Sequence, residues 1–166
     1  AFIEEYTARR IVVMVECHDV TGDDPAPDDP KVGVILDFFD RLAARWKDQP
    51  YVWFNPLNEP QTGVDADAVA NWTALQTEAY DRVRAHAPRG IYVADIPGHA
   101  QGLSTLTGRD AITSFGGARC NVVYAWHAYG AVGQDGAFGT SADDYDEQRS
   151  LAAHRKVFDF LKEKEI

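Results

Sequence analysis

Polar residues that can move protons or bind ligands follow each of four short apolar runs in this chain. Histidines and carboxylic acids predominate among them, and these side chains carry general acid and base catalysis or bind metals and sugars. In chain order they are His18 and Asp19, Asn58 and Glu59, Asp95 and His99, and His127 and Tyr129. Arginine, glutamine and proline stand before the runs, as is usual for loops in solvent. The one-sided distribution predicts a site where the ends of the runs converge.

Glu59 is the strongest candidate for a proton donor. It follows an apolar run and stands between Pro56 and Pro60, which restrict the backbone around it. A partly desolvated carboxyl favours its protonated form, and protonating a departing oxygen needs such a group. An Asn-Glu pair in a loop is more often a solvated turn, so the prediction depends on the position after a strand. His18 and His127 are equally compatible with buried structural histidines.

The periodicity of apolar residues predicts alternating strands and helices. The four runs have the length and composition of strands and comprise residues 11–17, 51–57, 91–95 and 122–127. Helical spacing predicts helices over residues 32–46, 69–83 and 151–161, a short helix around 103–114 and an amphipathic helix over 1–10. Successive strands start about 30 to 40 residues apart, which is the spacing of βα units.

This alternation predicts an α/β fold with a parallel sheet and helices outside it. Because the carboxyl ends of parallel strands share one edge, the polar residues after the runs should lie close together. None of the runs is followed by the glycine-rich loop of dinucleotide-binding folds. A partial TIM (β/α)8 barrel is therefore favoured over an open doubly wound sheet, with residues 1–166 as a single domain.

The composition disfavours several kinds of partner. The formal net charge is −10, with 26 acidic and 16 basic residues, and a charge of this sign repels nucleic acids and anionic lipid surfaces. The longest apolar stretch near the start, residues 11–15, is far shorter than the roughly 20 residues of a membrane span. We expect neither nucleic acid nor membrane partners. An acidic surface with many aromatic residues suits an uncharged polysaccharide, although ordinary solubility explains the charge equally well.

Four segments together resemble glycoside hydrolase family 5, most closely its bacterial endo-β-mannanases. They are VVMVECHDVTG (12–22), FNPLNEP (54–60), YVADIPGHAQG (92–102) and WHAYG (126–130), and they occur in the family's order. The resemblance implies a TIM barrel and makes Glu59 the general acid/base. It makes Asn58 the partner of the sugar 2-hydroxyl, places His18 in the same subsite, and gives His127 and Tyr129 the role of orienting the nucleophile and the substrate. We include Asp95 and His99 among the expected substrate-binding residues.

The resemblance also implies a reaction and a setting. Family members of this type hydrolyse β-1,4-linked mannan or glucan with retention, using a second carboxylate as nucleophile. The family's arginine from the second strand, nucleophile from the seventh and aromatic platform from the eighth have no counterpart in this sequence. We therefore expect the chain to supply the third to sixth βα units and to be inactive alone. No cofactor or metal is implied, and the enzyme would be secreted.

Two other function classes are compatible with the residues. A metal-dependent amidohydrolase barrel would use histidines and aspartates such as His18, Asp19, His99 and His127, which the fold places at one edge. That class normally has a His-x-His triplet after its first strand, whereas Tyr129 takes the second place of the only comparable triplet here. A non-catalytic carbohydrate-binding fragment is the third reading, and sugar binding without hydrolysis would distinguish it.

Overall fold

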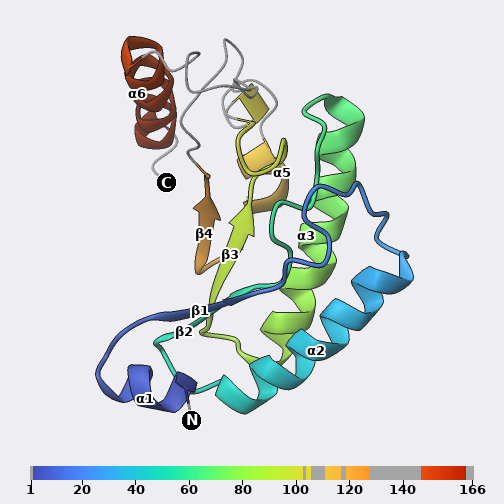
Figure 1. Ribbon diagram of the computed structural model, residues 1–166, viewed down its shortest axis with the longest axis vertical. Coiled ribbons are helices and arrows are strands. Elements are labelled where there is room, and N and C mark those ends of the chain that lie inside the picture. Colours follow the sequence, from blue (N-terminus) through green and yellow to red (C-terminus); the bar gives the residue numbers. More distant parts are fainter. Residues whose placement is uncertain (1, 103, 106–110, 117–118, 128–146, 164–166) are drawn as a thin grey trace.

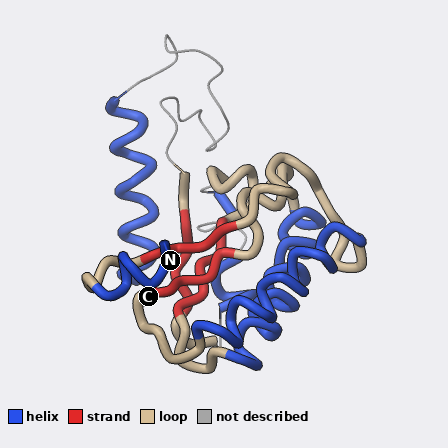
Figure 2. The backbone as a smooth tube through the Cα atoms, turned by 60° about the horizontal axis from the view of Figure 1, so that its bottom comes forward, coloured by secondary structure: helices blue, strands red, loops and turns tan. Residues whose placement is uncertain are grey.

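A computed structural model shows four parallel strands in one sheet, with two long helices packed side by side against it (Figures 1 and 2). It describes residues 2–102, 104–105, 111–116, 119–127 and 147–163. The strands are hydrogen-bonded in chain order and are β1 (Val13–Glu16), β2 (Val52–Asn55), β3 (Ile91–Asp95) and β4 (Val122–Ala125). The helices are α1 (Phe2–Ala8), α2 (Pro30–Trp46), α3 (Ala66–His86), α5 (Ala111–Gly116) and α6 (Glu147–Glu163).

Helices α2 and α3 start at aspartate caps. The Asp29 carboxylate accepts a hydrogen bond from the Lys31 backbone N–H at 2.8 Å, and Pro30 occupies the first turn, where its missing N–H costs nothing. Asp65 caps α3 in the same way, through the Ala68 N–H at 2.9 Å. Each cap satisfies a backbone donor that the first turn leaves without a helical partner. The caps therefore fix where each helix begins after its loop.

One face of the sheet is covered by α2, α3 and α5. The strands direct Val52, Phe54, Tyr92 and Ala94 into a core that includes Phe115 of α5, and all five are at most 1% exposed. The rings in this core pack edge to face with centroids about 5.5 to 6.3 Å apart, an arrangement that stabilises aromatic clusters. This layer anchors the sheet on its helices.

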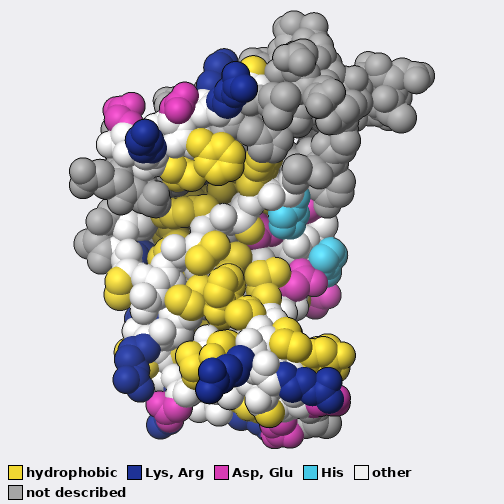
Figure 3. Space-filling view, turned by 90° about the vertical axis from the view of Figure 1, so that its left-hand side faces the viewer, with side chains coloured by type: hydrophobic (Ala, Val, Ile, Leu, Met, Phe, Trp, Pro, Cys, Tyr) yellow, Lys and Arg dark blue, Asp and Glu magenta, His cyan; other side chains and the backbone are white. Residues whose placement is uncertain are grey.

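The opposite face of the sheet is largely uncovered among the described residues. Parallel pairing puts Met14 beside Trp53 and Val93 beside Val123 on this face. Met14 is 46% exposed and Val123 38% exposed, in contrast to the buried side chains on the helix face. Figure 3 shows the apolar side chains gathered on this side, with histidine and acidic side chains together at its edge. In a closed (β/α)8 barrel this face lines the interior.

The structure confirms the predicted fold class and order of elements. The third strand has its predicted bounds, and the other three are shorter than predicted because their ends turn into loops before the apolar residues run out. The predicted helices over 32–46, 69–83 and 151–161 correspond to α2, α3 and α6. Of the helix predicted around 103–114, the structure describes residues 104–105 and 111–116, which are helical, the latter as α5; residues 103 and 106–110 lie outside the described residues. Among the described helices, none combines the length and apolarity that crossing a lipid bilayer requires.

Candidate active site

Glu59 lies in the loop that follows β2, at the carboxyl edge of the sheet. Glu59 as a whole is 7% exposed, and its backbone has a φ of 47°, a conformation that non-glycine residues rarely adopt. Its N–H donates to Asp95 Oδ2 at 3.0 Å, and its carbonyl accepts from the Gly22 N–H at 3.3 Å. Backbone strain of this kind persists where surrounding bonds impose it, often at functional sites. Neighbouring strands therefore hold Glu59 from both sides.

The imidazole of His127 lies between two carboxyl groups. Its Nδ1 is 2.6 Å from Glu59 Oε1, and its Nε2 is 3.3 Å from Asp95 Oδ2. The His127 backbone N–H donates to the Ala100 carbonyl at 2.8 Å, which fixes the residue just after β4. A ring nitrogen and a carboxyl oxygen 2.6 Å apart share a proton, so Glu59 and His127 form a coupled acid–base pair.

Asp95 ends β3 and is fully buried. Its Oδ1 accepts from the Asn55 side-chain amide at 2.8 Å, and its backbone carbonyl accepts from the Trp72 indole N–H at 2.6 Å. Burial raises the pKa of Asp95, although hydrogen bonding from the Glu59 N–H and the neighbouring His127 oppose that effect. A carboxyl without exposed surface has nothing to offer a sugar directly. The contacts that the structure gives the Asp95 carboxyl are to Asn55, Glu59 and His127, and its role as a substrate contact stays a prediction.

A second carboxylate–imidazole pair lies on β1. His18 Nδ1 is 2.7 and 2.8 Å from the two carboxylate oxygens of Glu16, while its Nε2 is 3.4 Å from the Asn58 side-chain nitrogen. The Asn58 amide also donates to Thr21 Oγ1 at 2.8 Å. The Glu16 carboxylate accepts a hydrogen bond from the Nδ1–H of His18. The lone pair on Nε2 can then accept a hydrogen bond from the Asn58 amide. Because the His18 side chain is 67% exposed, this pair is open to a ligand.

Asp24 fastens the segment that follows Glu59. Its Oδ1 accepts from Gln61 Nε2 and from the Thr62 backbone N–H, and its Oδ2 accepts from the Thr62 hydroxyl, all at 2.6 Å. Burial raises the pKa of Asp24, but hydrogen bonds from Thr62 outweigh it and the net pKa is lowered. The loop after β1 is thereby tied to the loop after β2.

The structure brings together five of the seven predicted site residues: His18, Asn58, Glu59, Asp95 and His127. His99 lies in the loop after β3 with a φ of 53°, and its backbone N–H donates to the Gln61 carbonyl at 2.8 Å. Tyr129 lies outside the described residues.

The sequence analysis missed Glu16, Thr21 and Asp24. Glu16 could have been found, because residues two apart on an extended chain point the same way and Glu16 precedes His18 by two. Nothing in the sequence indicates Asp24, which lies in an acidic, proline-rich loop. Within the described ranges, no three histidine, cysteine or acidic side chains gather as a metal-binding set, so they provide no ligand set for the amidohydrolase alternative.

The sequence model described as Cellulase (glycosyl hydrolase family 5) matches residues 1–166. The chain belongs to glycoside hydrolase family 5. Its sheet of βα units is accordingly part of a TIM barrel, as the sequence resemblance implied. Among curated proteins, none is similar enough to the chain to count as a match.

Solved structures with this fold include family 5 glucanases and mannanases. The catalytic domain of Thermobifida fusca endoglucanase Cel5A is 22% identical, with a TM-score of 0.63 over 99% of this chain and 58% of that chain. A triple mutant of the endo-β-1,4-glucanase from Xanthomonas axonopodis pv. citri is 18% identical, with a TM-score of 0.73 over 99% and 53%. The β-mannanase from Thermomonospora fusca is 23% identical, with a TM-score of 0.62 over 94% and 59%. The chain thus spans somewhat more than half the length of these proteins.

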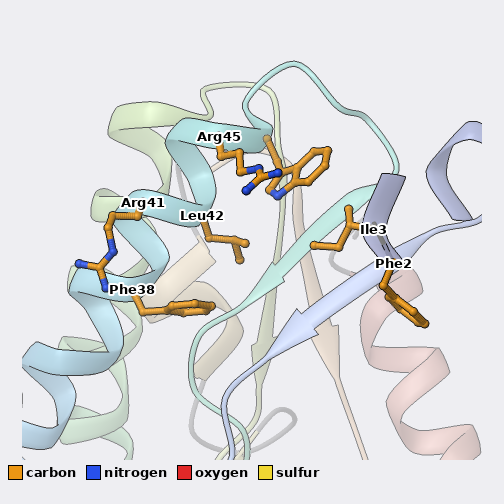
Figure 4. A pocket seen from close by; sticks show the side chains of 7 residues that line it. Phe2, Ile3, Phe38, Arg41, Leu42 and Arg45 are labelled. Carbon is orange, nitrogen blue, oxygen red and sulfur yellow. The ribbon is translucent and has the colours of Figure 1, made fainter. Parts of the chain in front are cut away.

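A separate hollow lies at the amino ends of the strands, away from the candidate site described above. It measures about 430 Å³ and is lined by Phe2 and Ile3 of α1 and by side chains in the second half of α2, including Phe38, Leu42 and Trp46. Figure 4 shows Ile3 of α1 extending towards Leu42 of α2, whereas the ring of Phe2 is turned away from α2. Active sites of (β/α)8 barrels form at the carboxyl ends of the strands, so this hollow is not the substrate site.

Proposed function

We propose that this chain is part of an enzyme that hydrolyses internal β-1,4 linkages of a glucan or mannan with retention of configuration. Glu59 acts as general acid in the first step and as general base in the second. The nucleophile, a second carboxylate, lies outside this chain. Retaining enzymes place their two carboxyl groups about 5 to 5.5 Å apart, so the partner of Glu59 must come from another part of the barrel.

The observation that carries this proposal is the coupled pair of Glu59 and His127 at the carboxyl edge of the sheet. The Glu59 side chain is 9% exposed and lies 2.6 Å from a ring nitrogen that can hold or release a proton. In the first step the nucleophilic carboxylate bonds to the sugar carbon as the bond to the glycosidic oxygen breaks, and that oxygen gains the proton of Glu59. In the second step Glu59 takes a proton from water, the oxygen of that water bonds to the sugar carbon, and the bond to the nucleophilic carboxylate breaks.

The proposed substrate class rests on the side chains around Glu59 and on the relatives. Asn58 and His18 lie on the β1 side of Glu59, where an amide and an exposed imidazole can bond sugar hydroxyls. His99 in the loop after β3 and Tyr129 complete the proposed substrate contacts. The similar structures are named as endoglucanases and a β-mannanase, which supports a β-1,4-linked backbone. Such polymers are too large for import, so we propose action outside the cell.

Replacing Glu59 by glutamine in the whole enzyme tests the proposal. Glutamine keeps the size of the side chain and removes the transferable proton, so we expect turnover of mannan or glucan to fall by about 100-fold or more. Glu5→Gln is the matched control. It makes the same chemical change on α1, where Glu5 is exposed and forms an ion pair with the exposed Arg9. Unchanged turnover of every β-glycan in Glu59→Gln would refute the role of Glu59.

A further inference from the structure

Asp95 is a buried ionisable group that the proposed chemistry does not use. It is 0% exposed, and its carboxyl oxygens receive three contacts, from the Asn55 amide, the Glu59 backbone N–H and His127 Nε2. The Asn55 amide and the Glu59 N–H can only donate, so each carboxyl oxygen of Asp95 acts as an acceptor, while His127 Nε2 lies 3.3 Å from Oδ2. Burying an unpaired charge costs folding free energy, so an aspartate with a purely structural role would destabilise the protein at this position.

Two of these contacts lead to Glu59 by separate routes. The first is the 3.0 Å bond from the Glu59 N–H, which helps to hold the residue at its φ of 47°. The second passes through His127, whose Nε2 is 3.3 Å from Asp95 and whose Nδ1 is 2.6 Å from the Glu59 carboxyl. Asp95 therefore bears on both the backbone and the side chain of the proposed acid/base.

The second route has a definite electrical consequence. The Glu59–His127 pair carries one exchangeable proton, and losing it leaves a negative charge on Glu59 with a second one on Asp95 close by. Like charges repel, so a negative charge on Asp95 acts against a negative charge on Glu59 and attracts a proton held on His127. The argument holds whether the proton rests on the carboxyl oxygen or on Nδ1.

The other elements around this group contribute few charges among the described residues. Helix α3 presents the neutral Trp72 and Gln76 to the Asp95 backbone carbonyl. On β3 itself, Tyr92 is fully buried, and burial raises its pKa well above the usual value, which keeps it neutral. On the β1 side Glu16 and His18 form an ionisable pair, and His18 contacts Asn58, the residue before Glu59. In the loop after β3, His99 interacts electrostatically with Asp24.

We propose that Asp95 is a positioning residue for the acid/base, acting through His127 and through the Glu59 backbone N–H to hold the carboxyl in place and to keep its proton on the Glu59–His127 pair. This inference rests on the proposed function of Glu59. Asp95 touches neither the substrate nor the reacting atoms. Its effect is confined to the step that needs a proton donor.

Asp95→Asn separates the charge from the shape. The buried Oδ1 of Asn55 has no hydrogen-bond partner among the described residues. Rotating the Asn55 amide by half a turn would direct that oxygen at the new amide nitrogen of residue 95, while the remaining oxygen of residue 95 still accepts from the Glu59 N–H. The variant can therefore fold with its bonds intact and its negative charge removed.

The experiment compares two substrates in the whole enzyme. A β-1,4-linked oligosaccharide has a poor leaving group and needs the acid, whereas a 2,4-dinitrophenyl β-glycoside has a good leaving group and does not. We expect Asp95→Asn to lower kcat on the oligosaccharide about tenfold or more and to change cleavage of the aryl glycoside bond about twofold at most. We also expect the basic limb of the pH profile to move down by about one unit. Asp48→Asn, the same change at an exposed ion pair with Arg89, should alter neither.

Three outcomes are decisive. Equal losses on both substrates, or an unmoved basic limb, would show that Asp95 only supports the fold, and the inference would be overturned. His127→Asn gives a second measurement: in that background Asp95→Asn should add little further selectivity, because the link to the carboxyl is already cut. If Glu59→Gln leaves oligosaccharide turnover intact, the proposed function itself fails, and that result is recognisable without the Asp95 variants.

Discussion

Replacing Asp24 by alanine should loosen the segment that carries the proposed acid/base. Asp24 accepts three hydrogen bonds at 2.6 Å from Gln61 and Thr62, which follow Glu59 by two and three residues. These three hydrogen bonds tie the loop after β1 to the segment that follows Glu59. Alanine removes all three acceptor contacts at once, whereas asparagine keeps the two on Oδ1 and lets the Thr62 hydroxyl accept in place of donating.

The expected cost follows from the number and exposure of these bonds. A net contribution of about 0.5 to 1.5 kcal/mol per bond would give up to about 4 kcal/mol. Asp24 is an exposed residue, so water competes for its oxygens and the low end applies. We expect Asp24→Ala to lower the free energy of unfolding by about 1 to 2 kcal/mol, and Asp24→Asn by about 0.5 kcal/mol. Misplacement of Glu59 should lower kcat of the whole enzyme by about tenfold in the alanine variant.

Urea unfolding of the whole enzyme at several pH values measures this, with kcat on an oligosaccharide as the functional readout. The pKa of Asp24 is lowered from its ordinary value of 3.8, since hydrogen bonds from Thr62 outweigh the opposing effect of burial. The stabilisation is therefore present above pH 3.8 and is lost as the pH falls through the lower pKa of the folded state. The gap between wild type and Asp24→Ala should be constant near neutrality and should narrow in acid.

Two results would refute this reasoning about Asp24. Equal unfolding midpoints for wild type and Asp24→Ala would mean that the three bonds contribute nothing to the folded state. A gap that widens in acid would mean that the carboxylate is not the stabilising form. If stability falls as expected and kcat does not change, the segment is held by other contacts and the positioning of Glu59 does not depend on Asp24.

Two further predictions concern the core and the uncovered face. Phe115→Ala should lower the free energy of unfolding by about 3 kcal/mol, because the ring is fully buried and packs edge to face against its aromatic neighbours. Urea unfolding measures this. The control Phe158→Ala, at a 66% exposed position, should lower the free energy of unfolding far less. Residues 1–166 alone should bind a hydrophobic dye such as anilinonaphthalene sulfonate and sediment as more than a monomer, and Met14→Glu should reduce both, because Met14 is 46% exposed on that face.

Much of the fold could be predicted because each strand is short, apolar and followed by a helical pattern. The β3 strand was predicted with its observed bounds, since residues 91–95 are apolar up to the aspartate that ends them. The first strand was predicted too long at both ends. Ile11 and Val12 are apolar but remain 47% and 42% exposed, because hydrogen bonding to β2 starts only at Val13. Apolar character alone does not show where pairing with a neighbouring strand begins.

The candidate site was predictable in its members and less so in its internal contacts. The rule that parallel strands end at one edge was enough to group Asn58, Glu59, Asp95 and His127. The carboxyl of Asp95 is enclosed by side chains from other elements, Asn55 of β2 and His127 after β4, and no local pattern reports such contacts. From the sequence alone, the exposed side chain of His18 and the buried one of Asp95 are therefore equivalent polar residues at a strand end.

The two carboxylate–imidazole pairs differ in burial, and under the proposed function this difference suits them to different tasks. The Glu16–His18 pair has side chains 33% and 67% exposed, so water and salt screen it and its ring is accessible to a sugar. In the Asp95–His127 pair the carboxyl is 0% exposed and the imidazole 27%, so its charges act on Glu59 with little screening. Proton transfer needs a strong, fixed field, and sugar binding needs access. The strand order places the Asp95–His127 pair, suited to proton transfer, on the β3 and β4 side of Glu59. It places the Glu16–His18 pair, suited to sugar binding, on the β1 side.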